Sequence, residues 1–218
     1  MAEHQEVLGP VASKLVLEND HVKIWEADVG PGEDFPLHHH SYDYVLFTTG
    51  APALLELRDY GRAPSTVAVP PHAAIFIPAG GTESYSNVGK TRFTEVLIEI
   101  KRPRRPDQER VDFATSNALA GREPLPGVVH LLENSRVRIV ETLLAPGESS
   151  GMSSQSDDAA VFVLSGAKLK IVEQDEKGKR AFEQNRSDRS AWWQAGGVRR
   201  DVLNCDNRPY RELSVQIK

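Results

Sequence analysis

The sequence predicts an all-β fold that contains two similar units in one chain of 218 residues. The first observation is a repeat, because LENDHVKI at Leu17–Ile24 returns as LENSRVRI at Leu132–Ile139. The second is that the hydrophobic segments are short, rich in β-branched residues and separated by Gly, Pro or Asn, as in antiparallel sandwiches and barrels. The third is that neither unit contains a long segment with the period of an amphipathic helix.

The repeat extends over the whole of each unit and therefore predicts the domain organisation. Three further pairs of segments match at offsets of 115, 116 and 117 residues: 31–33 with 146–148, 79–81 with 195–197, and 96–101 with 213–218. A drift of two residues requires only small loop insertions. We expect an N-terminal domain at 14–101, a linker at 102–127 that contains four prolines, and a C-terminal domain at 128–218.

Short segments rich in β-branched residues predict these strands in the first unit: Val22–Ala27, Tyr44–Thr48, Ala53–Leu57, Thr66–Val69, Ala74–Ile77 and Val96–Lys101. The second unit closes on a similar alternating strand at Leu213–Lys218. We expect at most a short helix at Asp112–Leu119, and a flexible polar loop at Met152–Ser156. Of Trp192 and Trp193, one is expected in the core and the other at the contact between the units, with both in the core as the alternative.

The composition is that of an ordinary globular protein, with 39% hydrophobic and 26% charged residues. A net charge of −5 argues against a nucleic-acid-binding surface, and the one basic run, Lys101–Arg105, is expected to be a solvated connector. Cys205 is the only cysteine, so no intrachain disulfide can form. Without a secretory signal or an apolar stretch long enough to span a membrane, the expected compartment is the cytoplasm.

His38 and His40 stand two residues apart in a segment that we expect to be a strand. Alternate side chains of a strand project from the same face, so these imidazoles point one way and His39 points the other. Their Cα atoms are then about 6.6 Å apart, which lets both rings reach one metal ion. The alternative is a solvated turn that happens to contain three histidines.

The residues around these histidines resemble the two sequence motifs of the cupin superfamily, and the repeat makes the chain similar to a two-domain bicupin. The first motif, G, five residues, H-x-H, is matched by Gly32, His38 and His40. The second, P-x-G, two residues, H, three residues, N, is matched by residues 78–87 (PAGGTESYSN) everywhere except at the histidine. The resemblance implies two double-sheet jelly-roll β-barrels, with a metal ion in the mouth of the barrel.

Two positions depart from the cupin pattern. Tyr44 takes the place of the usual carboxylate of the first motif, because Asp43 faces the opposite way. Glu83 takes the place of the histidine of the second motif, so the carboxylate lost from one motif returns in the other. The resemblance therefore implies that His38, His40 and Glu83 hold one divalent ion per chain, with Fe(II) favoured and Zn, Mn or Ni as alternatives.

Both unusual residues also have a purely structural interpretation. Glu83 could be a surface glutamate in a glycine-rich turn. Tyr44 could be a core tyrosine with a satisfied hydroxyl group. In the functional interpretation Tyr44 is catalytic, because a phenol beside the metal would have its pKa lowered by the cation and would serve as an acid or a base.

The second unit lacks this ligand set. The positions that correspond to His38, His40, Tyr44 and Glu83 hold Ser153, Gln155, Ala159 and Arg199. An arginine does not lose its proton to bind a metal, and its charge repels one. We therefore expect the C-terminal domain to be a structural or ligand-binding unit without a metal site.

The leading hypothesis is a metal-dependent enzyme that acts on a small molecule with its N-terminal domain, in the form of a dioxygenase if the ion is Fe(II). With Zn, Mn or Ni, isomerisation or elimination beside a carbonyl is expected instead, with Tyr44 moving the proton. The substrate is expected to be an oxygen-rich organic acid, and the chain is expected to form a homodimer. The alternatives are a non-catalytic bicupin that stores or senses a metal or small ligand, and a metal-free scaffold.

Overall fold

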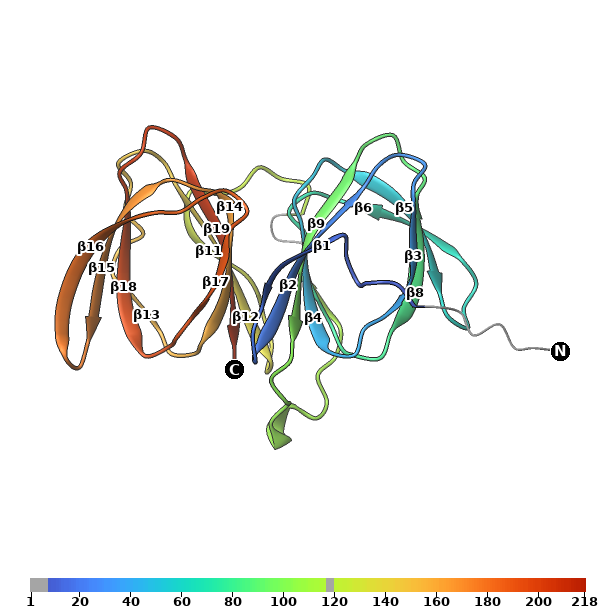
Figure 1. The fold of residues 1–218 in the computed structure, drawn as a ribbon, viewed down its shortest axis with the longest axis horizontal. Coiled ribbons are helices and arrows are strands. Elements are labelled where there is room, and N and C mark those ends of the chain that lie inside the picture. Colours follow the sequence, from blue (N-terminus) through green and yellow to red (C-terminus); the bar gives the residue numbers. More distant parts are fainter. Residues whose placement is uncertain (1–7, 117–119) are drawn as a thin grey trace.

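The structure, a computed structural model, describes residues 8–116 and 120–218 and consists almost entirely of β-strands. Its nineteen described strands form four sheets, two from the N-terminal half of the chain and two from the C-terminal half (Figure 1). The all-β class that the sequence predicts is therefore observed. Among the described residues, no helix has the length and apolar character needed to cross a membrane.

The N-terminal half contributes a six-stranded and a four-stranded sheet. The six-stranded sheet contains, in spatial order, β1 (Lys14–Glu18), β2 (Val22–Val29), β9 (Phe93–Ile100), β4 (Asp43–Thr48), β7 (Ala74–Ile77) and β10 (Ala114–Ser116). The four-stranded sheet contains β3 (Asp34–His39), β8 (Thr82–Asn87), β5 (Ala53–Asp59) and β6 (Ser65–Val69). The strands expected in this half are all present, with ends that differ by a few residues.

The C-terminal half contributes a five-stranded and a four-stranded sheet. The five-stranded sheet contains, in spatial order, β11 (Gly127–Glu133), β12 (Val137–Leu144), β19 (Tyr210–Ile217), β14 (Ala159–Ser165) and β17 (Ala191–Gln194). The four-stranded sheet contains β13 (Ser153–Gln155), β18 (Val198–Asn204), β15 (Lys168–Asp175) and β16 (Gly178–Asn185). Adding ten to each strand number of the N-terminal half reproduces this order, except for β10, which has no counterpart.

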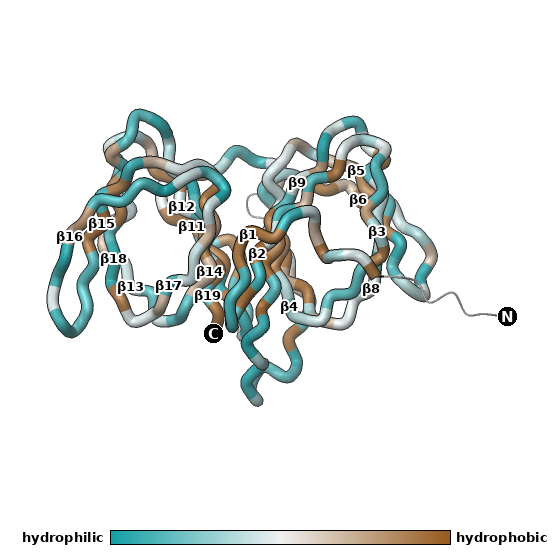
Figure 2. The backbone as a smooth tube through the Cα atoms, in the orientation of Figure 1, coloured by the Kyte–Doolittle hydropathy of each residue, from teal (hydrophilic) through white to brown (hydrophobic). Residues whose placement is uncertain are grey.

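The largest hydrophobic core lies between the two halves, not inside either of them. It joins buried side chains of β4, β7 and β9, such as Phe47, Phe76 and Ile98, to those of β14 and β19, such as Phe162 and Val215. Figure 2 shows the hydrophobic strands of both halves gathered where the halves meet. Because these strands alternate, one face of each large sheet covers the other half while the opposite face lines the interior of its own half.

The two neighbouring tryptophans divide their contacts as the sequence predicts. Trp192 packs against the small core inside the C-terminal half. Trp193 packs against the core between the halves and stacks on His21 with ring centroids 4.6 Å apart. Adjacent residues of a strand point to opposite faces, so one side chain faces inward and the other faces the partner half.

The connection between the halves differs from the expected linker in two ways. Ala114–Ser116 is not helical but forms β10, which pairs with β7 at the edge of the six-stranded sheet. The helical residues of the described chain are confined to a three-residue 3-10 helix at Pro106–Gln108. Residues 117–119, the end of the segment expected to be a short helix, lie outside the described residues. The proline-rich segment is thus partly recruited into the sheet, because β7 would otherwise leave an unpaired edge.

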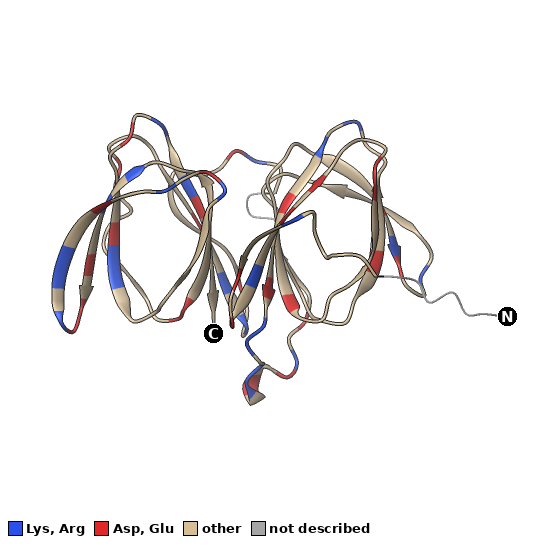
Figure 3. Ribbon diagram, viewed as in Figure 1, with Lys and Arg blue, Asp and Glu red and all other residues tan. Residues whose placement is uncertain are grey.

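The basic run 101–105 is not a solvated connector. The Arg102 guanidinium lies 2.6 Å from Asp158 of the C-terminal half, and the Arg104 guanidinium lies 2.5 Å from Asp43 of the N-terminal half. Elsewhere, acidic and basic residues are spread over both halves, with Lys and Arg prominent on β16 and β18 (Figure 3). The run therefore joins the two halves through ion pairs.

Candidate metal centre

The strand pair β3–β8 positions the three expected ligands. His38 lies directly opposite Glu83 in the antiparallel register, which contains an irregularity between Phe35 and His38. His40 follows at the end of β3, where its backbone N–H donates to the carbonyl oxygen of Gly81 over 2.9 Å. Both imidazoles are 1% exposed, and their Nε2 atoms lie 3.9 Å (His38) and 3.5 Å (His40) from Oε1 of Glu83.

The donor atoms fit one small divalent ion. One donor atom from each of His38, His40 and Glu83 lies within 4.8 Å of the other two, and no other such group occurs among the described residues. Four ligands around an ion with bonds of about 2.0 Å are about 3.3 Å apart, so the donor atoms need to close by between about 0.2 and 1.5 Å. Two neutral imidazoles and one carboxylate are ligands for Fe(II), Zn, Mn or Ni.

The protonation states also suit a metal site. Nδ1 of His38 lies 2.8 Å from the carbonyl oxygen of Pro36, which places its proton on Nδ1 and leaves the Nε2 lone pair facing Glu83. Burial lowers the pKa of His38, so its ring is neutral. Burial by itself raises the pKa of Glu83, but the interactions with His40 and His38 outweigh burial and the net pKa is lowered. The second nitrogen of His40, Nδ1, is buried without a hydrogen-bond partner among the described residues.

Tyr44 lies beside the three residues, and without a bound cation the pKa of its phenol is raised. Its ring stacks on the His40 imidazole, with centroids 3.8 Å apart and planes inclined by 12°. Burial, followed by the negative charge of Glu83, raises the pKa of Tyr44. The expected lowering by a cation would therefore have to overcome both effects. Without a cation, Tyr44 is a protonated phenol whose ring packs on the His40 imidazole.

His39 and Asp43 lie outside the group. Nδ1 of His39 is 2.8 Å from the hydroxyl oxygen of Thr82, across the strand pair. Asp43 is buried on the opposite face of β4, where it accepts hydrogen bonds from Arg104. Both placements follow from the alternation of side chains along a strand.

Sequence reasoning missed two buried polar groups of the same interior. Glu95 on β9 is 7% exposed, and burial, followed by the charge of Glu83, raises its pKa to about 8. The hydroxyl oxygen of Tyr85 on β8 is buried without a hydrogen-bond partner among the described residues. The alternation of β8 could have identified Tyr85, because it is two residues beyond Glu83. Glu95 carries a weaker signal, since only a charged residue within an otherwise hydrophobic strand marks it.

The raised pKa of Glu95 predicts a pH-dependent stability. Between pH 4.5 and about 8 the unfolded chain has lost this proton while the folded chain retains it, so stability falls as pH rises through that window. In metal-free protein, Glu95→Gln should remove this loss, which amounts to about 1.4 kcal/mol per pH unit. Urea unfolding at pH 5 and pH 8 measures the difference. Glu56→Gln, at a partly exposed position, is the control, and equal pH profiles for Glu95→Gln and the unmodified chain would contradict the assignment.

The C-terminal half has no such ligand set, and its register corrects one correspondence. Ser153 lies directly opposite Arg200, as His38 lies opposite Glu83, so Arg200 and not Arg199 is the counterpart of Glu83. Residues 153–155 also form β13 and are not a flexible loop. The second unit has one extra residue before this strand, so the correspondence shifts from Arg199 to Arg200. Neighbouring residues of a strand face opposite ways, so Arg199 points to the other face of the sheet.

Comparisons with known proteins agree with the fold. No protein-family model and no curated protein sequence matches the chain. Among solved structures, AerE from Microcystis aeruginosa is 15% identical with a TM-score of 0.61, and the match covers 95% of this chain and 97% of AerE. A variant of Bacillus subtilis oxalate decarboxylase is 11% identical with a TM-score of 0.67, covering 96% of this chain and 78% of that one. At these identities the similarity shows the fold alone.

Proposed function

We propose that the chain is a bicupin in which each half is a barrel, and that it is a metal-dependent enzyme acting on a small molecule in its N-terminal half. The observation that carries this proposal is the group formed by the buried His38 and His40 and the partly buried Glu83, at β3 and β8. The domain limits proposed for the two barrels are 14–101 and 128–218. The C-terminal barrel would be without metal, because Arg200 stands where the N-terminal half has Glu83.

The residues of the site divide the work of holding an ion and handling protons. A divalent ion held there would act as a Lewis acid toward a substrate oxygen, and Fe(II) would also allow dioxygen chemistry. Glu83 supplies the negative charge, and Pro36 fixes the ring of His38. Burial and the charge of Glu83 raise the pKa of the Tyr44 phenol and of the Glu95 carboxyl, so both groups lie within electrostatic reach of the ligands.

An oxygen-rich organic acid is the proposed substrate class. Its carboxylate would approach the positive charge of the ion, while a protonated Tyr44 and Glu95 can donate hydrogen bonds to anionic oxygens. The similarity in fold to oxalate decarboxylase, whose name gives a small acid as its substrate, supports the same class.

Metal analysis followed by an activity screen tests the proposal. Protein purified without added metal should contain one divalent ion per chain, measured by elemental analysis. The loaded protein is then incubated with a panel of small organic acids that includes oxalate, while oxygen uptake and carbon dioxide release are recorded. A loaded protein that turns over none of them would favour the non-catalytic bicupin, and a protein that binds no metal would refute both.

Tyr44→Phe separates a catalytic tyrosine from a core tyrosine. The change removes only the hydroxyl group and keeps the ring that stacks on His40. Metal content should stay within a few-fold, while turnover should fall by about a hundredfold or more if the hydroxyl transfers a proton. The pH dependence of turnover should change as well. Unchanged turnover would leave Tyr44 with the role of positioning His40.

A further inference from the structure

A polar cavity of about 130 Å³ lies inside the C-terminal half. Its lining includes three arginines, Arg138, Arg186 and Arg200, and only one carboxylate, Glu212. Three valines, at 128, 140 and 202, supply apolar wall. Val128 and His130 are exposed, so the cavity opens along the edge strand β11. A cavity of roughly 150 Å³ is large enough for a six-membered carbon ring, so this one admits a small organic molecule.

The cavity occupies the same place in its half as the metal ligands do in the N-terminal half. Ser153 and Gln155 line it from β13, and Arg200 lines it from β18 directly opposite Ser153. In the N-terminal half, the corresponding strand pair presents His38 opposite Glu83. Replacing a carboxylate with a guanidinium at this position reverses the charge that the site offers to a ligand.

Buried polar atoms of the cavity wall lack partners. The Nε atoms of Arg138 and Arg186 and the Oε1 atom of Gln216 are buried and have no hydrogen-bond partner among the described residues. The side chain of Arg186 is only 6% exposed. A buried donor without an acceptor costs about 1–3 kcal/mol, and more when it is charged, so a ligand that supplies acceptors would be stabilised here.

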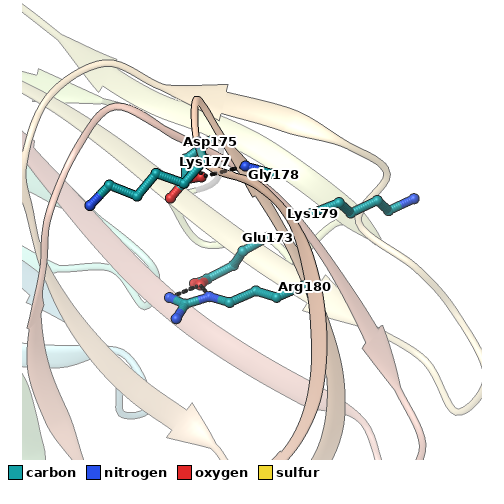
Figure 4. A pocket seen from close by; sticks show the side chains of 6 residues that line it. All are labelled: Glu173, Asp175, Lys177, Gly178, Lys179 and Arg180. Atoms are coloured by element: carbon teal, nitrogen blue, oxygen red, sulfur yellow. Dashed lines mark hydrogen bonds and ion pairs between the residues drawn. The ribbon is translucent and has the colours of Figure 1, made fainter.

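Carboxylates hold the three arginines in place and balance much of their charge: Arg138 pairs with Glu133, Arg186 with Glu212 and Arg200 with Glu173. Arg200 pairs with Glu173, and the same carboxylate also pairs with Arg180, which reaches it along the β15–β16 hairpin (Figure 4). These three groups together therefore carry one positive charge. Arg186 donates to Glu212 over 2.7 Å and to the hydroxyl of Tyr210 over 2.6 Å, which fixes its guanidinium beside Trp192. Held guanidinium groups recognise carboxylates at a small entropic cost.

We propose that this cavity binds a small organic dicarboxylate, independently of any metal in the N-terminal half. The arginines and the hydroxyl and amide groups of Ser153, Gln155 and Gln194 would bind the carboxylates, and the valines would contact the carbon chain. The valine wall is the reason for choosing an organic acid over sulfate or phosphate, which have no apolar part.

Succinate titration of the metal-free full chain tests the proposal. The protein is treated with a chelator, and sodium succinate is titrated calorimetrically at constant ionic strength, with sodium sulfate as the comparison anion. We expect saturable binding of one succinate per chain, and binding of sulfate at least tenfold weaker. Arg200→Gln should weaken succinate binding at least tenfold, whereas Arg199→Gln, its exposed neighbour, should change it less than twofold.

Two further variants cover the remaining outcomes. Ser153→Leu should abolish succinate binding, because the larger side chain fills the cavity without changing its charge. This variant tests the proposal if Arg200→Gln does not fold. His38→Ala should bind succinate as the unmodified chain does, which separates this site from the N-terminal one. Equal losses for Arg199→Gln and Arg200→Gln, sulfate binding as tight as succinate binding, loss of binding in His38→Ala, or no saturable binding would each overturn the proposal.

Discussion

His38→Ala should leave the chain without its divalent ion. The substitution removes one of the three donor atoms, at a residue that is 1% exposed, and alanine supplies no ligand in its place. Changes outside the ligand shell of metal sites already lower affinity about 10–100-fold, so loss of a ligand should lower it by at least about a hundredfold. Elemental analysis and competition with a chromophoric chelator measure the effect.

His39→Ala is the matched control, because the His39 ring bonds to Thr82 instead of joining the group. Its metal content should stay within a few-fold of the unmodified chain. If both variants lose the ion equally, the effect would come from damage to β3 and not from the loss of a ligand.

Substitutions of Glu83 test the exchanged carboxylate directly. Glu83→Gln keeps the shape and removes the charge, so it should weaken metal binding. Glu83→His should restore much of the binding with a neutral ligand, as at the usual cupin position. Metal affinity that is the same in Glu83→Gln as in the unmodified chain would show that the carboxylate is not a ligand.

Asp43→Ala should destabilise the folded chain by about 3–5 kcal/mol, because it removes one partner from a buried ion network. Asp43 is 4% exposed and Arg136, from the C-terminal half, is 1% exposed, with Nε of Arg136 lying 3.3 Å from Oδ2 of Asp43. Arg104 completes the network with a hydrogen bond of 2.9 Å to Asp43. Without the carboxylate, the Arg136 guanidinium keeps its backbone carbonyl partners but has no counter-charge.

The network also predicts acid sensitivity. Burial by itself raises the pKa of Asp43, but the hydrogen bonds from Arg104 and the N–H of Ala79 and the charges of Arg104 and Arg136 outweigh it, so the pKa is lowered. A lowered pKa stabilises the fold above the usual carboxyl pKa, and this contribution is lost as pH falls through the folded-state value. Urea unfolding at pH 7 and pH 3 measures this. The free energy of unfolding should fall less between the two pH values in Asp43→Ala than in the unmodified chain.

Asp28→Ala is the control for the ion network, since Asp28 pairs with Arg92 at an exposed position. Exposed ion pairs contribute about 0–1 kcal/mol, so the free energy of unfolding of this variant should be close to that of the unmodified chain. If Asp28→Ala and Asp43→Ala lower the free energy of unfolding by similar amounts, burial does not determine the strength of the ion network.

The features of local strand geometry could be predicted from the sequence. Alternation alone separates His38 and His40 from His39, and motif spacing alone places Glu83 near them. The repeat also anticipates a similar set of strands in both halves. Each of these rests on short-range periodicity, which the order of residues records directly.

Features that depend on long-range contact could not be read in this way. Glu95 lies on β9, which belongs to the other sheet from Glu83 on β8, and only the packing of the two sheets brings it into the same interior. Arg104 looked like a solvated residue because nothing in its own segment reveals Asp43. The sequence indicates Arg199 instead of Arg200 as the counterpart of Glu83, because two copies of one repeat do not show where the extra residue of the second unit lies. Strand register decides such cases, and register is set by turns and packing across the sheet.

The core shared by the two halves has a consequence for how such a chain can change. In a symmetric dimer of a single unit, every substitution occurs in both subunits, so replacing a metal-binding side chain removes it from both sites. Joining the two units in one polypeptide removes that constraint, because each half can be altered alone. What the C-terminal half must preserve is the hydrophobic face that Phe162 and Val215 present to its neighbour. Its interior is free to diverge, and a guanidinium can stand where the other half has a carboxylate while the pair still folds as one body.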